Sequence, residues 1–164
     1  MSEYQTAIDP GLPDKAAEKD IISWGETFST GIESIDKQHR HLVALTNQLY
    51  KACMVGGDSS NKAFKESMKR VVEYVRFHFH TEQEILEKIN YPDILKHKKE
   101  HEALIMQILD FSTNKAGAKR FVPNNFVRFL KDWIVSHIAH SDKMYGRYIE
   151  AQKKKGLLSE IDIK

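Results

Sequence analysis

Apolar residues recur at steps of three and four along most of this chain, which is the period of an amphipathic α-helix. The first such stretch begins near Ile35, with Ser34 as its expected cap, and ends at Gly56. The second begins after the capping residue Asp58 and reaches Ile89. The pattern therefore predicts two long helices in the first half of the chain.

Two further helices follow in the second half. The turn sequence Asn90-Tyr91-Pro92 separates the second helix from the third, and Pro92 suits the first turn of the third helix. The fourth helix is expected to begin near Pro123 and to stop at Gly156. Because short connections favour antiparallel neighbours, the sequence predicts an all-α fold, an up-down-up-down antiparallel four-helix bundle.

The two ends of the chain differ from this pattern. Residues 1–20 are polar and contain two prolines, so they predict a flexible leader. The segment that follows carries Trp24 and Phe28 among turn-forming residues, and we interpret it as an ordered N-terminal loop, or arm, that lays aromatic rings on the core. The bundle domain is expected to span 21–155, followed by a short tail at 156–164.

Composition narrows the class of protein without identifying a function. The length of 164 residues fits one domain, and the net charge of +2 favours neither nucleic acid nor an anionic membrane as a partner. There is one cysteine, Cys53, which excludes an internal disulfide framework. No apolar run is long enough for a transmembrane helix and no signal peptide is evident, so a cytoplasmic monomer is expected.

The chemically informative residues lie on the apolar faces of the predicted helices. A single histidine on such a face is usually a satisfied core residue, but here each of the four helices carries one, together with two carboxylates. An unpaired buried carboxylate costs several kcal/mol, roughly, and a bound cation removes that cost. The sequence therefore predicts a metal site, and its candidate ligands are His39, His78, Glu82, His97, His101, His137 and Asp142.

The spacing of these residues fits chelation, with one exception. Residues four apart lie on one helix face, so His97 and His101 can hold one ion together. His137 and Asp142 are five apart, which separates them by about 140° on an ideal helix. Either a carboxylate that bridges from the side or a local π-helical widening would bring them together, and the sequence leaves both open.

Ligand type limits the choice of metal. Imidazole and carboxylate suit iron, zinc or copper, and seven ligands exceed the four of one zinc site, so two ions fit best. Di-iron is the usual occupant of such bundles. The predicted site is nevertheless histidine-rich and lacks the Glu-x-x-His motif of ferritin-like proteins among its ligands.

Four stretches together resemble the hemerythrin family, in particular its single-domain bacterial members. They are Ile35-Asp36-Lys37-Gln38-His39, then His78-Phe79-x-x-Glu82-Gln83, then Tyr91-Pro92 with His97-Lys98-Lys99-Glu100-His101-Glu102, and finally Trp133-Ile134-x-x-His137-x4-Asp142-Lys143-x-Tyr145. The resemblance covers roughly residues 22–150 and fills all seven ligand positions in order.

The resemblance implies a complete di-iron centre. It assigns one iron to His97, His101 and His137, and the other to His39 and His78. Glu82 and Asp142 would bridge the two non-haem iron ions, together with an oxo or hydroxo group. In the family, dioxygen binds at the open position of the second iron as a hydroperoxide.

Further residues were assigned around this site. Ile134 and Ile138, one turn or less from His137, are expected to form the wall of the dioxygen pocket, and Trp133 and Phe79 are candidates for the same wall or for plain core packing. The three remaining histidines are off the ligand face and are expected to be exposed; they are His41, His80 and His140.

Four functions remain open, of which iron or zinc buffering is the weakest because two ions per chain store little metal. Reversible, non-catalytic oxygen binding (as a carrier, store or local supply) is the first, with dioxygen and an unidentified recipient protein as partners. An oxygen- or redox-sensing regulatory module is the second. A di-iron oxidase or peroxidase is the third, because an open iron permits that chemistry and the fold alone does not decide between them.

Overall fold

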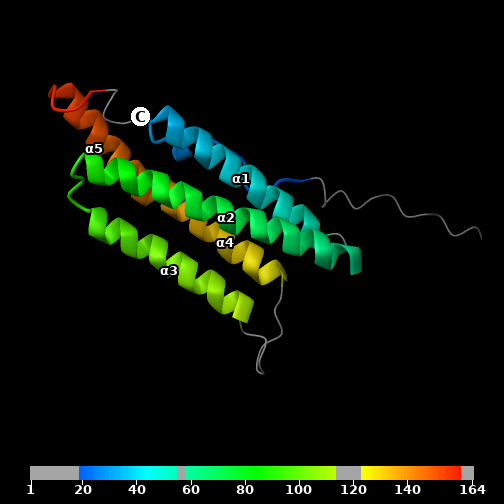
Figure 1. The fold of residues 1–164 in the computed structure, drawn as a ribbon. Helices are drawn as coiled ribbons and strands as arrows, with labels where there is room; N and C mark the ends of the chain where they lie inside the picture. Colours follow the sequence, from blue (N-terminus) through cyan, green and yellow to red (C-terminus); the bar gives the residue numbers. More distant parts are fainter. Residues whose placement is uncertain (1–18, 55–57, 114–122, 160–164) are drawn as a thin grey trace, which may run out of the picture.

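The computed structural model describes residues 19–54, 58–113 and 123–159, and the fold is all-α. The helices are α1 (Glu33–Met54), α2 (Asp58–Lys88), α3 (Ile94–Thr113), α4 (Pro123–His137) and α5 (Lys143–Lys154), with a short 3₁₀ turn η2 (Glu26–Phe28) and a π-helical segment η3 (Ile138–Asp142). The chain reverses direction from α1 to α2, from α2 to α3 and from α3 to α4 (Figure 1). The predicted antiparallel four-helix bundle is confirmed, with α4, η3 and α5 together forming the fourth helix.

The ends of α2 and α5 are closed by residues in the left-handed region. Asn90 follows α2 with φ of 52°, while the Tyr91 N–H bonds to the Leu86 carbonyl at 2.9 Å. Gly156 follows α5 with φ of 70°, and it is the predicted stop. Both are Schellman-type ends, which satisfy carbonyls that the helix leaves free.

Two predicted helix starts are wrong. Ser34 lies inside the first turn of α1, which begins at Glu33, so it is not the cap. Asp36 of the same turn reaches back to the preceding loop, where its Oδ1 accepts the Thr30 backbone N–H at 2.8 Å. Pro92 lies in the turn before α3, since the left-handed Asn90 delays the helix until Ile94.

Asn47 of α1 holds the start of the N-terminal arm through its side-chain amide. The Asn47 Oδ1 accepts the backbone N–H groups of Ile21 and Ile22, and its amide donates to the Ile22 carbonyl at 2.9 Å. Trp24 and Phe28 are partly buried against the main hydrophobic core. The predicted ordered loop is therefore confirmed.

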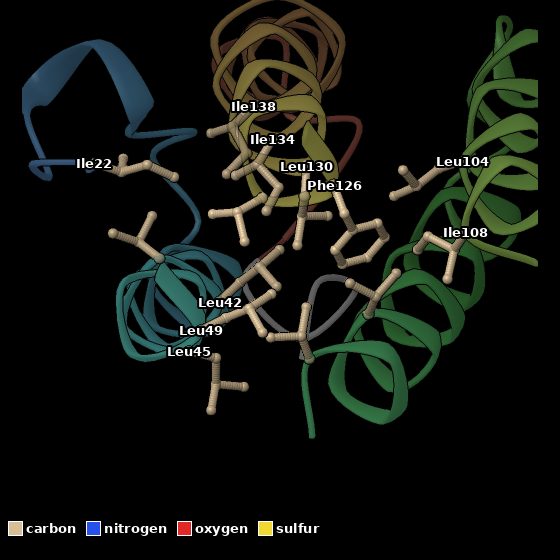
Figure 2. Packing of buried hydrophobic residues seen from close by; sticks show 14 of the residues in the cluster. Ile22, Leu42, Leu45, Leu49, Leu104, Ile108, Phe126, Leu130, Ile134 and Ile138 are labelled. Atoms are coloured by element: carbon tan, nitrogen blue, oxygen red, sulfur yellow. The ribbon is translucent and has the colours of Figure 1, made fainter. Parts of the chain in front are cut away.

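The core fills the space between the helices on one side of the polar cluster described below. Leu42 and Leu49 of α1 face Phe126, Leu130 and Ile134 of α4, while side chains of α3 enter from the other side (Figure 2). Each such buried leucine contributes roughly 1.5–3 kcal/mol. A second, smaller apolar cluster lies at the other end, around Tyr145 and Ile149.

The predicted domain boundaries are not decided by these contacts. The leader 1–20 lies almost wholly outside the described residues, although Asp20 forms an ion pair with Lys51 at 2.8 Å. Part of the tail 156–164 is described, and Leu158 packs against the smaller cluster. Among the described helices, none combines the length and the apolar character that crossing a membrane requires.

Candidate metal centre

All four helices of the bundle send histidine or carboxylate side chains into its interior. The seven predicted ligands are 0–5% exposed: His39 comes from α1, His78 and Glu82 from α2, His97 and His101 from α3, His137 from the end of α4, and Asp142 from η3. Such a concentration of polar groups between two apolar clusters is unusual, because a buried charge needs a partner.

The seven side chains form two groups that share their carboxylates. In one group Glu82 and Asp142 meet three histidines, His97, His101 and His137, with all donor atoms within 4.8 Å of one another. In the other, the same two carboxylates meet His39 and His78. This arrangement can hold two cations side by side, with Glu82 and Asp142 between them.

Glu82 and Asp142 each contact both groups. Glu82 Oε2 lies 3.3 Å from the Nε2 of His101, whereas Oε1 lies 3.5 Å from the Nε2 of His78. Asp142 Oδ1 lies 3.1 Å from the Nε2 of His137, and Oδ2 lies 3.2 Å from the Nε2 of His39. Each carboxylate therefore directs one oxygen to each group, as a bridging ligand would.

The five-residue step between His137 and Asp142 is accommodated by a π-helical turn. Residues 138–142 form η3, and the flanking residues His137 and Lys143 keep right-handed helical dihedrals. Because π-helical hydrogen bonds join residues five apart, both side chains can face the same site. Of the two alternatives that the sequence left open, the structure shows the π-helical one.

The donor set fits a metal ion better than it fits a hydrogen-bond network. Neither ring nitrogen of His39 and neither oxygen of Asp142 has a hydrogen-bond partner among the described residues. The Nε2 atoms of His101 and His137 lie 2.9 Å apart and point at the same region. Groups that are buried, convergent and unsatisfied by protein partners are characteristic of cation ligands.

A family model described as the hemerythrin HHE cation binding domain matches residues 30–149 of this chain. The chain belongs to the hemerythrin family. The match spans α1 to the middle of α5, and it therefore includes all seven predicted ligands.

Individual hemerythrin relatives agree with this assignment. Bacteriohemerythrin from Methylococcus capsulatus is 28% identical, over 80% of this chain and 98% of the relative. A hemerythrin-like protein from Naegleria gruberi is also 28% identical, over 76% of this chain and 90% of the relative. A crystal structure of wild-type hemerythrin, 27% identical, superposes with a TM-score of 0.70 over 77% of this chain and 96% of that one.

Around the predicted ligands lies a second layer of polar side chains that the sequence analysis did not assign. The amide oxygen of Gln38 accepts a hydrogen bond from His78 Nδ1 at 2.9 Å, which leaves the Nε2 lone pair free for a cation. The amide nitrogen Nε2 of Gln83 lies 3.4 Å from His101 Nδ1, and the carboxylate oxygen Oε2 of Glu100 lies 3.2 Å from His137 Nδ1. The Tyr145 hydroxyl donates to Glu82 Oε1 at 2.5 Å.

One feature of the sequence identifies three of these four outer residues, namely their position next to a predicted ligand. Gln38, Gln83 and Glu100 are each the immediate chain neighbour of a ligand. A neighbour on a helix is rotated by about 100°, so it points to the adjacent helix, where it meets the ligand of another element. Tyr145 lies three residues after Asp142, on the same inner face of the helix.

Two aromatic rings pack flat against the histidines of the larger group. Phe79 stacks on His101, with ring centroids 3.5 Å apart and planes within 2°. Trp133 stacks on His137 at 4.2 Å and 16°. These rings hold the imidazoles in place, which is a more specific role than the general core packing that the sequence suggested.

The electrostatics of the cluster without a cation show how strongly its members interact. Burial acts to lower the pKa of His39, but the Asp142 and Glu82 carboxylates outweigh it and raise that pKa to about 9. At His78, in contrast, burial dominates and lowers the pKa to about 4. The histidines around Glu82 overcome its burial and keep its pKa well below the usual range. The carboxylates therefore stay ionised, as metal binding requires.

The other predicted residues are placed as follows. Ile134 and Ile138 are 0% and 2% exposed and belong to the main core; they lie three residues before and one residue after His137. His41, His80 and His140 are exposed, as predicted. His80 lies 3.3 Å from the exposed Glu84, far from the donor atoms of the site along the outer face of α2.

Proposed function

We propose that this chain binds dioxygen reversibly at a non-haem di-iron centre and acts as a carrier, store or local supply of the gas. The observation that supports the proposal is the unequal division of five histidines between two groups that share Glu82 and Asp142. Three histidines complete one ion, while two leave the other ion a free position for a small ligand. The names of the relatives, bacteriohemerythrin and hemerythrin, support the same function.

Each side chain has a defined task under this proposal. His97, His101 and His137 would hold one iron, His39 and His78 would hold the other, and Glu82 and Asp142 would be shared between the two. When bound, two ferrous ions supply the two electrons that dioxygen takes up on binding and returns on release. Histidine-rich ligation carries little negative charge, so it favours that return over deeper oxidation of the metal.

The residues around the ions keep the reaction reversible. Ile134 and Ile138 are buried beside His137 and are proposed to exclude water from the bound gas. The Tyr145 hydroxyl fixes the orientation of Glu82 through its hydrogen bond to Oε1. The proposed functional unit is the domain 21–155, working as a monomer that binds dioxygen without catalytic turnover and passes it to a protein partner.

Repeated oxygenation of the iron-loaded protein tests this function. The protein is loaded anaerobically with two equivalents of ferrous iron, dioxygen is admitted, and the visible spectrum is recorded before and after purging. We expect a charge-transfer band that appears with dioxygen, disappears on purging and returns in the next cycle. A one-way change with release of hydrogen peroxide would instead make the protein an oxidase or a redox sensor.

Two variants show whether the spectrum comes from the assigned ligands. His101→Ala removes one donor of the three-histidine group and is expected to lose bound iron and the band. His80→Ala removes an exposed histidine of α2 and should leave the bound iron and the visible band unchanged. If His101→Ala kept two irons and normal oxygenation, the ligand assignment would be wrong.

A further inference from the structure

Glu100 connects both ends of the π-helical segment to α3. Its Oε2 lies 3.2 Å from Nδ1 of His137, the residue that precedes η3. The same oxygen accepts a hydrogen bond from Oγ of Ser141 at 2.5 Å, and Ser141 directly precedes Asp142. One carboxylate oxygen therefore spans the turn that carries two predicted ligands.

The contact of Glu100 with His137 and Ser141 explains why the π-helical turn forms at this position of the helix. A π-helical turn is rare and occurs mostly as a single turn at functional sites, so its position along a helix needs a local cause. Within η3 the described residues offer no side-chain cap. An anchor from the neighbouring helix supplies that cause, because it restrains His137, the residue before the widened turn, relative to Ser141, the fourth residue of the turn.

The charge of Glu100 distinguishes His137 from the other histidines. The outer nitrogens of His78 and His101 face the neutral amides of Gln38 and Gln83, whereas that of His137 faces a carboxylate. A histidine whose second nitrogen is hydrogen-bonded to a carboxylate is a more basic metal ligand. The carboxylate of Glu100 thus adds electron density, through His137, to the group formed by His97, His101 and His137.

We propose that Glu100 is a positioning residue that anchors the π-helical turn through His137 and Ser141, and that its charge favours the oxidised state of the ion held by the three-histidine group. The proposal rests on the metal centre of the proposed function and not on dioxygen. Glu100 acts through His137 and does not itself touch a metal. Its side chain is 31% exposed, at a surface crevice lined also by Lys96 and Met144, so substitution is compatible with folding.

Zinc binding to the metal-free protein tests the anchoring role without redox chemistry. We expect Glu100→Ala to weaken one of two zinc equivalents by about 10- to 100-fold, the usual cost of losing an outer partner of a metal ligand. Ser141→Ala should weaken the binding of the same zinc equivalent. Its effect on affinity should be smaller when Glu100→Ala is already present, because both variants remove the same contact. Glu102→Gln, an exposed change on the same helix, is the matched control and should bind zinc normally.

Two further readouts separate positioning from a merely structural role. In the zinc-loaded protein, ¹⁵N NMR should show the His137 Nδ1–H resonance shifted in Glu100→Gln, with the resonances of His78 unchanged. In the iron-loaded protein, anaerobic spectroelectrochemistry, in which the electrode supplies each electron, should show a more positive reduction potential for Glu100→Gln. Glu102→Gln should match the native potential.

The outcomes are distinguishable from failure of the proposed function. If the native protein binds fewer than two zinc ions, the metal centre itself is wrong. If it binds two, but Glu100→Ala and Glu100→Gln match Glu102→Gln in affinity, NMR shift and potential, the role of Glu100 is refuted. Loss of affinity with an unchanged potential would refute the electronic part and keep the anchor.

Discussion

Individual imidazoles in this protein are oriented by the group at the nitrogen that faces away from the site. The amide oxygen of Gln38 can only accept, so its 2.9 Å contact requires a proton on His78 Nδ1 and frees Nε2. Stacked rings add a second restraint, since Phe79 and Trp133 lie flat against His101 and His137. The ligand atoms are thus held in place before any cation arrives, which lowers the cost of binding.

The residue whose substitution best tests the dioxygen pocket is Ile134. Ile134→Ala should leave iron binding intact but speed autoxidation several-fold, because a cavity beside His137 admits water to the bound gas. Truncating a fully buried side chain also costs about 2–5 kcal/mol of stability. The rate is measured as the first-order loss of the oxygenated visible band.

Leu130→Ala is the matched control for this experiment. Leu130 is equally buried, belongs to the same core and lies one helical turn farther from His137. It should show a similar loss of stability with native autoxidation. Equal autoxidation rates in the two variants would remove Ile134 from the pocket wall.

At the scale of the elements, α5 is positioned by an unusually close backbone approach. A Cβ added at Gly146 would lie 2.3 Å from the carbonyl oxygen of Thr30, so the helix and the loop before α1 touch without any intervening side chain. The same loop is fixed by Asp36, which accepts hydrogen bonds from both the backbone and the hydroxyl of Thr30. The close approach of Gly146 to Thr30 therefore fixes the position along the bundle axis at which the neighbouring Tyr145 reaches Glu82.

Gly146→Ala should therefore act on the site through the helix. The new methyl group collides with backbone, which cannot move aside easily, so we expect a loss of about 1–3 kcal/mol in the free energy of unfolding. The shift of α5 should also lengthen the Tyr145–Glu82 hydrogen bond and weaken metal binding. Chemical denaturation and zinc titration measure the two effects, with the exposed Glu150→Ala of the same helix as control. Native values for Gly146→Ala would show that α5 is not held by this approach.

The helices and the side chains that meet in the buried polar cluster were predictable from the sequence, but the contacts between helices were not. Periodicity placed His39 and His101 on inner faces because a helix repeats every 3.6 residues, whatever lies beside it. The five-residue step to Asp142 could not be resolved in that way, since the choice between a π-helical turn and a sideways carboxylate depends on α3. The start of α1 was missed for a similar reason, since it depends on the loop before the helix, where Thr30 donates hydrogen bonds to Asp36.

At the scale of the whole molecule, the polar cluster replaces apolar packing at the centre of the bundle. The two apolar clusters lie on either side of it, and at its level histidines and carboxylates from all four helices of the bundle converge. A ligand that binds only the folded state stabilises it, by about 4 kcal/mol at a thousand times its dissociation constant. Bound metal should accordingly tie together four helices that are otherwise joined at the two ends.

The metal-free protein should become less stable as the pH rises from about 6.5 to about 9. His39 releases its proton near pH 6.5 in the unfolded chain but only near pH 9 in the folded protein, because Asp142 and Glu82 outweigh its burial and raise its pKa. The folded state then binds more protons than the unfolded state, so its stability is complete below pH 6.5 and declines above it, by at most about 1.4 kcal/mol per pH unit for one proton. The raised pKa of His137, where Asp142 likewise outweighs burial, acts in the same direction.

Urea denaturation at a series of pH values measures this slope, in chelator-treated protein and in protein loaded with zinc. A bound ion occupies the His39 nitrogen and excludes its proton, so the slope in this window should disappear on loading. His80→Gln, which removes an exposed histidine paired with Glu84, should leave the slope of the metal-free protein unchanged. Stability that stayed flat or rose between pH 6.5 and 9 without metal would mean that His39 is neutral in the folded protein, and that the buried carboxylates draw their compensating charge from other histidines of the cluster.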